Sequence, residues 1–224
     1  MTSVSATSVP CIAVIGDVVH SRQIRDRNAA QAELVSLLDS INDRFHTTLL
    51  APFRISSGDE IQALFAAGHA LPDLVWESFT DFAHPIRYGI GRGELNTELG
   101  PDPRLTDGPA WWNARSAIRL SVATKRTGGV FIGFGERQDI TLTALGTLLQ
   151  HVRSGLTKRQ ATVLSLLRSG GDMVRIAEQL KITRQAVSRT ASSAGWRAYH
   201  EGEAAWKSLL SEYDYAELWS HARS

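Results

Sequence analysis

The sequence lacks several features that would assign it to a class at once. It has a single cysteine, Cys11, so no internal disulfide can form, and a cytoplasmic protein is expected. Its longest apolar stretch, residues 11–19, contains Gly16 and Asp17 and is much shorter than the ~20 residues that span a bilayer. The seven histidines include no pair at metal-ligand spacing, and the sequence has no Gly-x-Ser-x-Gly motif and no internal repeat. We therefore expect neither a disulfide scaffold nor a membrane partner, and we expect Cys11, at the start of a buried strand, to be inert.

What is present predicts an ordinary folded chain. Of the 224 residues, 43% are hydrophobic and 21% are charged, a composition that can form a core. Residues 1–10 are rich in serine and threonine and have no basic start, which predicts a loose tail rather than a signal peptide. The length fits one large domain, or one medium domain with one small one.

Positive charge is concentrated in one block of an otherwise balanced chain. Residues 151–200 hold nine basic residues against two acidic ones, whereas residues 1–150 hold 13 basic and 16 acidic residues. The last 24 residues hold two basic and five acidic residues. The basic residues of the block are Arg153, Lys158, Arg159, Arg168, Arg175, Lys181, Arg184, Arg189 and Arg197. Such a block predicts a polyanionic partner, although a solvated helical face has the same composition.

Three helices with clear boundary signals are predicted inside this basic block. Thr157 and Gln160 form a capping box at the start of the first helix, and Gly170-Gly171 ends it. Asp172 and Thr183 are the N-cap residues expected for the second and third helices. The apolar positions recur at helical spacing throughout, so we expect a small all-α domain over residues 156–200.

The stretch Arg175-Ile-Ala-Glu-Gln-Leu-Lys-Ile-Thr-Arg-Gln-Ala-Val-Ser-Arg189 resembles the helix-turn-helix of bacterial regulators. This resemblance implies a second helix that enters the major groove of double-stranded DNA, while the first helix crosses the backbone. The residues expected to meet base edges are Thr183, Arg184, Gln185, Ser188 and Arg189, and those expected to meet phosphates are Lys158, Arg159 and Arg175. One such unit covers few base pairs, so a homodimer is expected. The alternative is a three-helix bundle that binds protein.

The C-terminal residues 201–224 predict an aromatic helix. The residues that recur at helical spacing are Trp206, Leu209, Leu210, Tyr213 and Trp219. We expect this stripe to pack on the first domain or to form a dimer contact.

Residues 11–150 alternate between strand and helix patterns. The expected strands are 11–19, 53–57, 61–65, 86–91 and 129–134, and the expected helices are 28–47, 71–82, 110–124 and 141–152. The order β-α-β-β-α-β followed by α-β predicts an α/β (α+β) domain of the ferredoxin-like type with an addition.

Several motifs of this domain resemble a known family. They are Ala13-Val-Ile-Gly-Asp-Val-Val-His-Ser-Arg22, Ser57-Gly-Asp-Glu60, Arg87-Tyr-Gly-Ile-Gly-Arg-Gly93, and Asp107-Gly-Pro-Ala110 with Ala114-Arg115. Together with the C-terminal helices they resemble the SatD family of bacterial proteins over nearly the whole chain. This resemblance implies no particular activity.

A more distant resemblance connects the first domain to class III nucleotidyl cyclases and GGDEF-type palm domains. Asp17 at the end of the first strand and Asp59-Glu60 in the central hairpin match the positions of the metal carboxylates in those enzymes. Gly89-Ile-Gly-Arg-Gly-Glu94 is similar to a motif of their later strand. The resemblance implies a Mg²⁺ site at Asp17, Asp59 and Glu60 and a bound nucleotide. Guanidinium groups match phosphate geometry, so Arg22, Arg92 and Arg115 are the expected phosphate ligands.

Ordinary structural roles also fit these residues. Gly-Asp-Glu between two strands is a common hairpin turn, Asp17 is a possible capping residue, and the glycines at 89, 91 and 93 form only a weak phosphate-loop signal. The Asn and Arg that the cyclases keep four residues apart have no counterpart here at that spacing.

Two hypotheses of function remain. The first is a DNA-binding regulator whose cyclase-like domain senses a nucleotide or a metal, or serves only in assembly. The second is a Mg²⁺-dependent nucleotidyl-transfer or cyclase-type enzyme with an appended nucleic-acid-binding module. The incomplete catalytic set favours the first and leaves enzymatic activity open.

Overall fold

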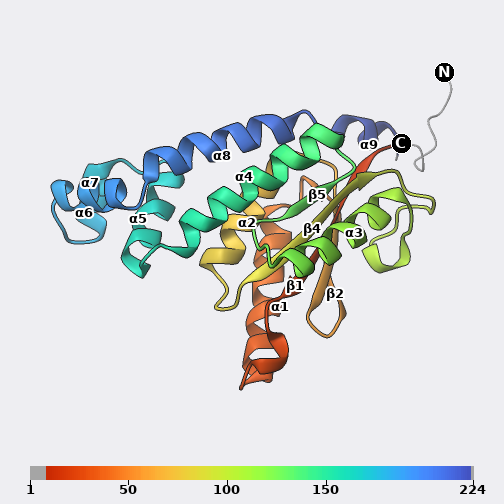
Figure 1. The fold of residues 1–224 in the computed structure, drawn as a ribbon, viewed down its shortest axis with the longest axis horizontal. Coiled ribbons are helices and arrows are strands. Elements are labelled where there is room, and N and C mark those ends of the chain that lie inside the picture. Colours follow the sequence, from red (N-terminus) through yellow and green to blue (C-terminus); the bar gives the residue numbers. More distant parts are fainter. Residues whose placement is uncertain (1–8, 223–224) are drawn as a thin grey trace. The chain divides into compact units, whose positions relative to one another are not determined.

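A computed structural model describes residues 9–222, which form two compact units (Figure 1). Of the described residues, 9–147 and 206–222 belong to the sheet unit, and Leu148–Ala205 form the helical unit. The boundary falls inside α4 (Glu136–Ser154) and inside α8 (Trp196–Ser211). No helix in the described part of the chain has both the length and the apolar character needed to cross a membrane. The fold is therefore a mixed α/β sheet unit and an all-helical unit near the C-terminus.

The sheet has five strands in the order β2-β3-β1-β4-β5. The strands are β1 (Cys11–Val18), β2 (Leu49–Ser57), β3 (Glu60–Phe65), β4 (Ile86–Gly93) and β5 (Val130–Ile132). β1 lies between β3 and β4 and is antiparallel to both, β2 pairs antiparallel with β3, and β5 pairs parallel with β4. β1 is covered on both faces, as expected of a central strand. Burial there raises the pKa of the Cys11 thiol to about 12, which keeps it neutral.

Two of the expected strands differ from the observed ones for local reasons. β2 begins at Leu49 rather than at residue 53. β2 contains Pro52, and proline usually indicates that a strand is interrupted. It is tolerated here because β2 is an edge strand with an irregular register. β5 covers only 130–132 of the expected 129–134, because Gly129 and Gly133 have positive φ and bound it on both sides.

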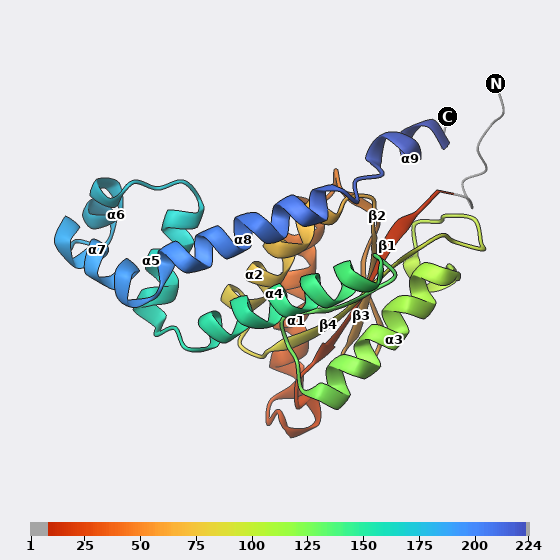
Figure 2. The ribbon, with the colours of Figure 1, turned by 45° about the horizontal axis from the view of Figure 1, so that its top comes forward.

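Helices cover both faces of the sheet (Figure 2). α1 (Arg27–Arg44) and α2 (Leu71–Thr80) lie on one face, and α3 (Pro109–Thr124) lies on the other. The hydroxyls of Ser78 on α2 and Tyr88 on β4 are 2.5 Å apart. Tyr88 therefore faces α2. Because successive residues of a strand face opposite sides of the sheet, the next residue, Gly89, faces α3. Short 3-10 segments occur at η2 (Ser21–Gln23), η3 (Gly68–Ala70) and η4 (Pro103–Leu105).

The glycines of β4 have a packing role. Gly89, Gly91 and Gly93 all face α3, and a Cβ atom at any of them would overlap the helix backbone. At Gly91 the overlap is with Ala114 and Ala110. The glycine run that gave a weak phosphate-loop signal in the sequence is thus explained by the close approach of a helix to a strand.

The aromatic residues near the C-terminus belong to the core of the sheet unit. Trp206 on α8 packs edge-on against Phe131, with ring centroids 5.7 Å apart, and Tyr213 packs in the same way against Phe134 at 4.9 Å. Trp219 on α9 (Ala216–Ala222) is buried and donates its indole N–H to the Pro10 carbonyl at 2.8 Å. The tail therefore packs on the first domain, one of the two roles expected of it. Of the expected loose tail, residues 1–8 lie outside the described residues.

The helical unit contains three helices with the predicted boundaries: α5 (Lys158–Arg168), α6 (Met173–Gln179) and α7 (Arg184–Ser193). All three predicted N-caps are confirmed: Thr157 in a capping box with Gln160, Asp172, and Thr183. Gly170, with φ of 84°, follows α5 as predicted. The buried core of the three helices is Val163, Ile176, Ala177, Val187 and Ala191.

A buried polar network joins α4, α5 and α8 within this unit. The Glu203 carboxylate accepts hydrogen bonds from Arg168 Nε at 2.8 and 3.0 Å and from the Tyr199 hydroxyl at 3.2 Å. That hydroxyl accepts in turn from a terminal nitrogen of Arg153 at 3.2 Å. Arg153 is fully buried and is linked to the Glu203 carboxylate only through the Tyr199 hydroxyl, whereas Arg168 contacts that carboxylate directly.

Replacing Gly91 by alanine should strongly destabilise the sheet unit. The added methyl group must displace the backbone of α3, and overpacking of this kind costs about 3 kcal/mol or more. The midpoint of thermal unfolding, followed by circular dichroism, should fall by roughly 6–10 °C. Gly100→Ala is the matched control, because nothing lies within 4 Å of its Cβ position, and it should leave the midpoint unchanged. Equal midpoints for the two variants would contradict the packing role.

Replacing Glu203 by glutamine should destabilise the helical unit by about 3–5 kcal/mol, because it breaks the buried ion pair with Arg168. Glu201→Gln, two residues away on α8, is the control. Glu201 pairs with Arg197 at 2.9 Å, but that pair is exposed, so its loss should cost less than about 0.5 kcal/mol. Urea unfolding of the full chain measures both changes. A small effect of Glu203→Gln would mean that water replaces the lost contacts.

Candidate functional site

The turn between α6 and α7 fixes the direction of α7. α6 ends at Gln179 with Leu180 as its C-cap, and Lys181 adopts the left-handed conformation with φ of 53°. Thr183 then caps α7 by accepting the Ala186 N–H at 3.1 Å. Val187 and Ala191 are buried against α5 and α6. With its inner face fixed in this way, α7 presents the opposite face to solvent.

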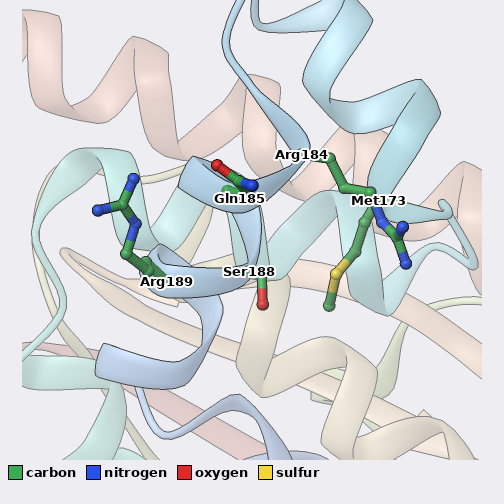
Figure 3. Close-up of a pocket in the computed structure, with 5 residues that line it drawn as sticks. All are labelled: Met173, Arg184, Gln185, Ser188 and Arg189. Atoms are coloured by element: carbon green, nitrogen blue, oxygen red, sulfur yellow. The ribbon is translucent and has the colours of Figure 1, made fainter.

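Four predicted residues of α7 gather on that outer face: Arg184, Gln185, Ser188 and Arg189. They line a shallow hollow of about 490 Å³ together with Met173, the first residue of α6. Figure 3 shows Arg189 on one side of this hollow, Met173 and Arg184 on the other, and Gln185 and Ser188 between them. All four polar side chains are exposed, and none has a hydrogen-bond partner among residues 9–222.

The remaining predicted DNA contacts lie outside the hollow. The Thr183 hydroxyl serves as the N-cap of α7. Lys158 and Arg159 are exposed in the first turn of α5, and Arg175 is exposed on α6 with Asp172 at 3.4 Å. The residues from 179 to 200 include no acidic side chain. Asp172 on the preceding turn lies near α7, because its pKa is lowered first by the N–H groups of Arg175 and Val174 and also by the guanidinium of Arg184.

Met173 is the residue of the hollow that the sequence analysis missed. It lies three positions before Ile176, and its side chain is partly buried against the core of the three helices. The i, i+3 spacing to Ile176 predicts that it shares the inner face of α6, and this signal was available in the sequence.

A second candidate site lies at the end of β1 in the sheet unit. Asp17 pairs in register with Glu60 on β3 and with Arg87 on β4, and Asp59 lies in the hairpin turn between β2 and β3. An Arg87 nitrogen lies 3.4 Å from the Asp17 carboxylate. The pKa of Asp17 is raised, first by burial and then by the neighbouring Asp59 carboxylate, and the guanidinium of Arg87 offsets only part of this.

Asp17 lies near both Asp59 and Glu60, whose carboxylates add to the effect of burial in raising its pKa. Across residues 9–222, no three His, Cys, Asp or Glu side chains lie together as a metal would require. Glu60 instead forms an ion pair with Arg115 on α3 at 2.6 Å and accepts from Gln62 at 2.8 Å. Arg115, which was expected to bind a phosphate, therefore pairs with one of the three carboxylates.

The three expected phosphate ligands also lie apart. Arg22 is exposed on η2, and Arg115 is bound to Glu60. Arg92 is paired opposite Ile12, five residues before Asp17 on β1, which at ~3.3 Å per residue separates it from Asp17 by roughly 17 Å.

Arg92 has structural partners instead. Its Nε donates to the Tyr215 hydroxyl at 2.5 Å, and its guanidinium carbon lies 5.6 Å from the ring centroids of both Tyr213 and Tyr215. A terminal nitrogen of Arg92 donates to the Gly133 carbonyl at 3.2 Å. Arg92 thus ties β4 to the aromatic tail.

A small cavity lies beside Asp59. It has a volume of about 70 Å³ and is lined mainly by η2, α1 and the hairpin turn. Its lining residues include Val18, Ile24, Arg27, Leu34, Asp59 and Phe82. Ligand pockets usually measure about 300–1,000 Å³, so this cavity by itself has no room for a nucleotide base with its sugar.

Comparison with known proteins gives the family but no activity. No curated protein matches the chain. The sequence profile of the SatD family matches residues 11–210, which include both units apart from the terminal segments, and the chain therefore belongs to the SatD family.

Proposed function

We propose that this chain is a cytoplasmic DNA-binding regulatory protein, in which α6 and α7 form a helix-turn-helix. The observation that carries the proposal is the hollow on the outer face of α7, where Arg184, Gln185, Ser188 and Arg189 lie together, exposed and without a side-chain hydrogen bond to any of residues 9–222. Because α7 is held in place by its buried inner face, the polar side chains on its outer face are available to a partner.

The chemistry of these side chains suits the major groove of DNA. Arginine pairs with guanine through two hydrogen bonds, and glutamine pairs with adenine in the same way. Ser188 lies between them and can donate to or accept from either kind of base. Lys158, Arg159 and Arg175, exposed on α5 and α6, are the proposed phosphate contacts.

Charge favours DNA over a protein partner. The helical unit, residues 148–205, contains nine basic and four acidic residues. Three of the four acidic residues already have partners within the unit: Asp172 caps α6, Glu201 pairs with Arg197, and Glu203 pairs with Arg168. Among residues 9–222, the side chains of Arg184 and Arg189 form no hydrogen bond or close ion pair, although Arg184 is near enough to Asp172 to help lower the pKa of that carboxyl. Positive charge is therefore exposed on the proposed recognition face. Because one helix-turn-helix covers few base pairs, we further propose that the protein binds as a homodimer.

The test is the double variant Arg184→Ala with Arg189→Ala, in the full chain. We expect loss of detectable binding to a duplex selected by the wild-type protein, because each arginine contact with a base contributes about 1–3 kcal/mol. The slope of log K against log salt for any residual binding should change little, because the proposed phosphate contacts Lys158, Arg159 and Arg175 are kept. Fluorescence anisotropy over a range of salt concentrations measures both quantities.

Arg119→Ala with Arg137→Ala is the matched control. Both arginines are exposed in the sheet unit, and their loss changes the net charge of the chain by the same amount. This control should keep wild-type affinity. Equal weakening by both double variants, or wild-type binding that does not depend on salt, would rule out the proposed surface.

A second candidate function belongs to the sheet unit: binding of a nucleotide with Mg²⁺ at Asp17 and Asp59. The strand order β2-β3-β1-β4 and the element order β-α-β-β-α-β agree with a ferredoxin-like, cyclase- or palm-type fold. The specific observation in its favour is the proximity of the two carboxylates, which raises the pKa of Asp17. Mg²⁺ commonly uses one or two carboxylates, with water and substrate phosphates completing its shell.

The same geometry favours binding over turnover. Glu60 is neutralised by Arg115, and Arg92 is held by the aromatic tail. Neither is available as the metal or phosphate ligand that catalysis of the cyclase type would need. We therefore propose a sensing role for this domain rather than an enzymatic one.

Calorimetric titration of ATP and of GTP, each with and without Mg²⁺, tests this second function. Binding should require Mg²⁺, and Asp59→Asn should weaken it at least tenfold, because one of two carboxylate ligands is lost. Asp81→Asn, an exposed carboxylate after α2, should have no effect. Absence of binding in the wild type would leave the sheet unit without a nucleotide site.

A further inference from the structure

The hollow on α7 contains one apolar side chain among four polar ones. Met173 comes from α6, whereas its four neighbours in the hollow come from α7. The other four lining residues can all form hydrogen bonds, and two of them are cationic. A thioether cannot substitute for them in hydrogen bonding, so its contribution to a partner must come from apolar contact.

The position of Met173 is set by contacts on both sides. Asp172 accepts the N–H groups of Val174 and Arg175 at 2.8 and 3.0 Å, which fixes the first turn of α6. The Met173 side chain packs partly against the core that holds Ile176, and the rest of it borders the hollow beside Arg184 (Figure 3). Its apolar surface is therefore presented at a fixed place next to the polar side chains.

Base edges offer one apolar group in the major groove, the methyl group of thymine. We propose that Met173 is a specificity-determining residue that contacts a thymine methyl group when α7 lies in the major groove. This inference rests on the proposed DNA binding of α7. It adds a contact from α6 and predicts a preference for thymine next to the base pair that Arg184 contacts.

Replacement of thymine by deoxyuridine tests the proposal, since the two bases differ only by this methyl group. Duplexes of about 30 base pairs, long enough for two half-sites ~10 base pairs apart, are first selected from a random pool by the wild-type full chain. Each thymine of the selected duplex is then replaced in turn. Anisotropy titrations at about 150 mM salt give the affinity of every duplex for every variant.

One replacement per half-site should weaken wild-type binding about three- to fivefold, the effect expected for one buried methyl group. The same replacement should have no effect on Met173→Ala, because that variant has lost the apolar partner of the methyl group. Met173→Leu, which keeps an apolar side chain of similar volume, should retain the effect and also guards against a folding defect in the alanine variant. Val174→Ala, at a half-exposed neighbour outside the hollow, should behave as wild type.

Two results would overturn the inference. In one, no thymine replacement changes wild-type affinity. In the other, Met173→Ala responds to every replacement as the wild type does. Failure of the proposed function gives a different result: the double variant Arg184→Ala with Arg189→Ala would then bind the selected duplex as tightly as the wild type does.

Discussion

The close approach of α3 to β4 is the contact on which the geometry of the sheet unit depends. Three glycines in alternate positions of β4 leave the space that the backbone of α3 occupies, so the helix lies nearer the strand than side chains would permit. That position brings Arg115 within reach of Glu60, and it directs the chain to β5 on the far side of β4. The packing of α3 on β4 thus lowers the net negative charge of the carboxylate site, because Arg115 pairs with Glu60.

Local signals in the sequence predicted the helical unit well. Thr157, Asp172 and Thr183 are each followed within three residues by the N–H group that they cap, so the predicted helix starts needed no knowledge of the tertiary fold. The exposed residues of α7 followed in the same way from the buried positions Val187 and Ala191. The exposed outer face of α7 was therefore predictable apart from Met173, and its contact with DNA stays a prediction.

The sheet unit was less predictable because its decisive contacts join distant parts of the chain. The order of strands and helices followed from hydrophobic periodicity, but the partners of individual charges did not. Arg92 and Tyr215 are separated by 123 residues, and Arg115 and Glu60 by 55. Arginine next to a glycine-rich strand is equally consistent with a phosphate ligand and with a packing residue, and no local pattern decides between them. At the site of Asp17, Asp59 and Glu60, the ion pair of Glu60 with Arg115 is accordingly the feature that the sequence could not predict.

The helical unit interrupts the sheet unit along the chain, since residues 148–205 separate Thr147 from Trp206. The aromatic residues Trp206, Tyr213 and Trp219, which complete the core of the sheet unit, are therefore synthesised after the whole helical unit. The core contacts of α5, α6 and α7 join residues close in sequence, and contacts of this kind form quickly. Because local contacts form first, α5, α6 and α7 can pack before residues 206–219 have joined the sheet unit, so the unit that begins second along the chain can fold first.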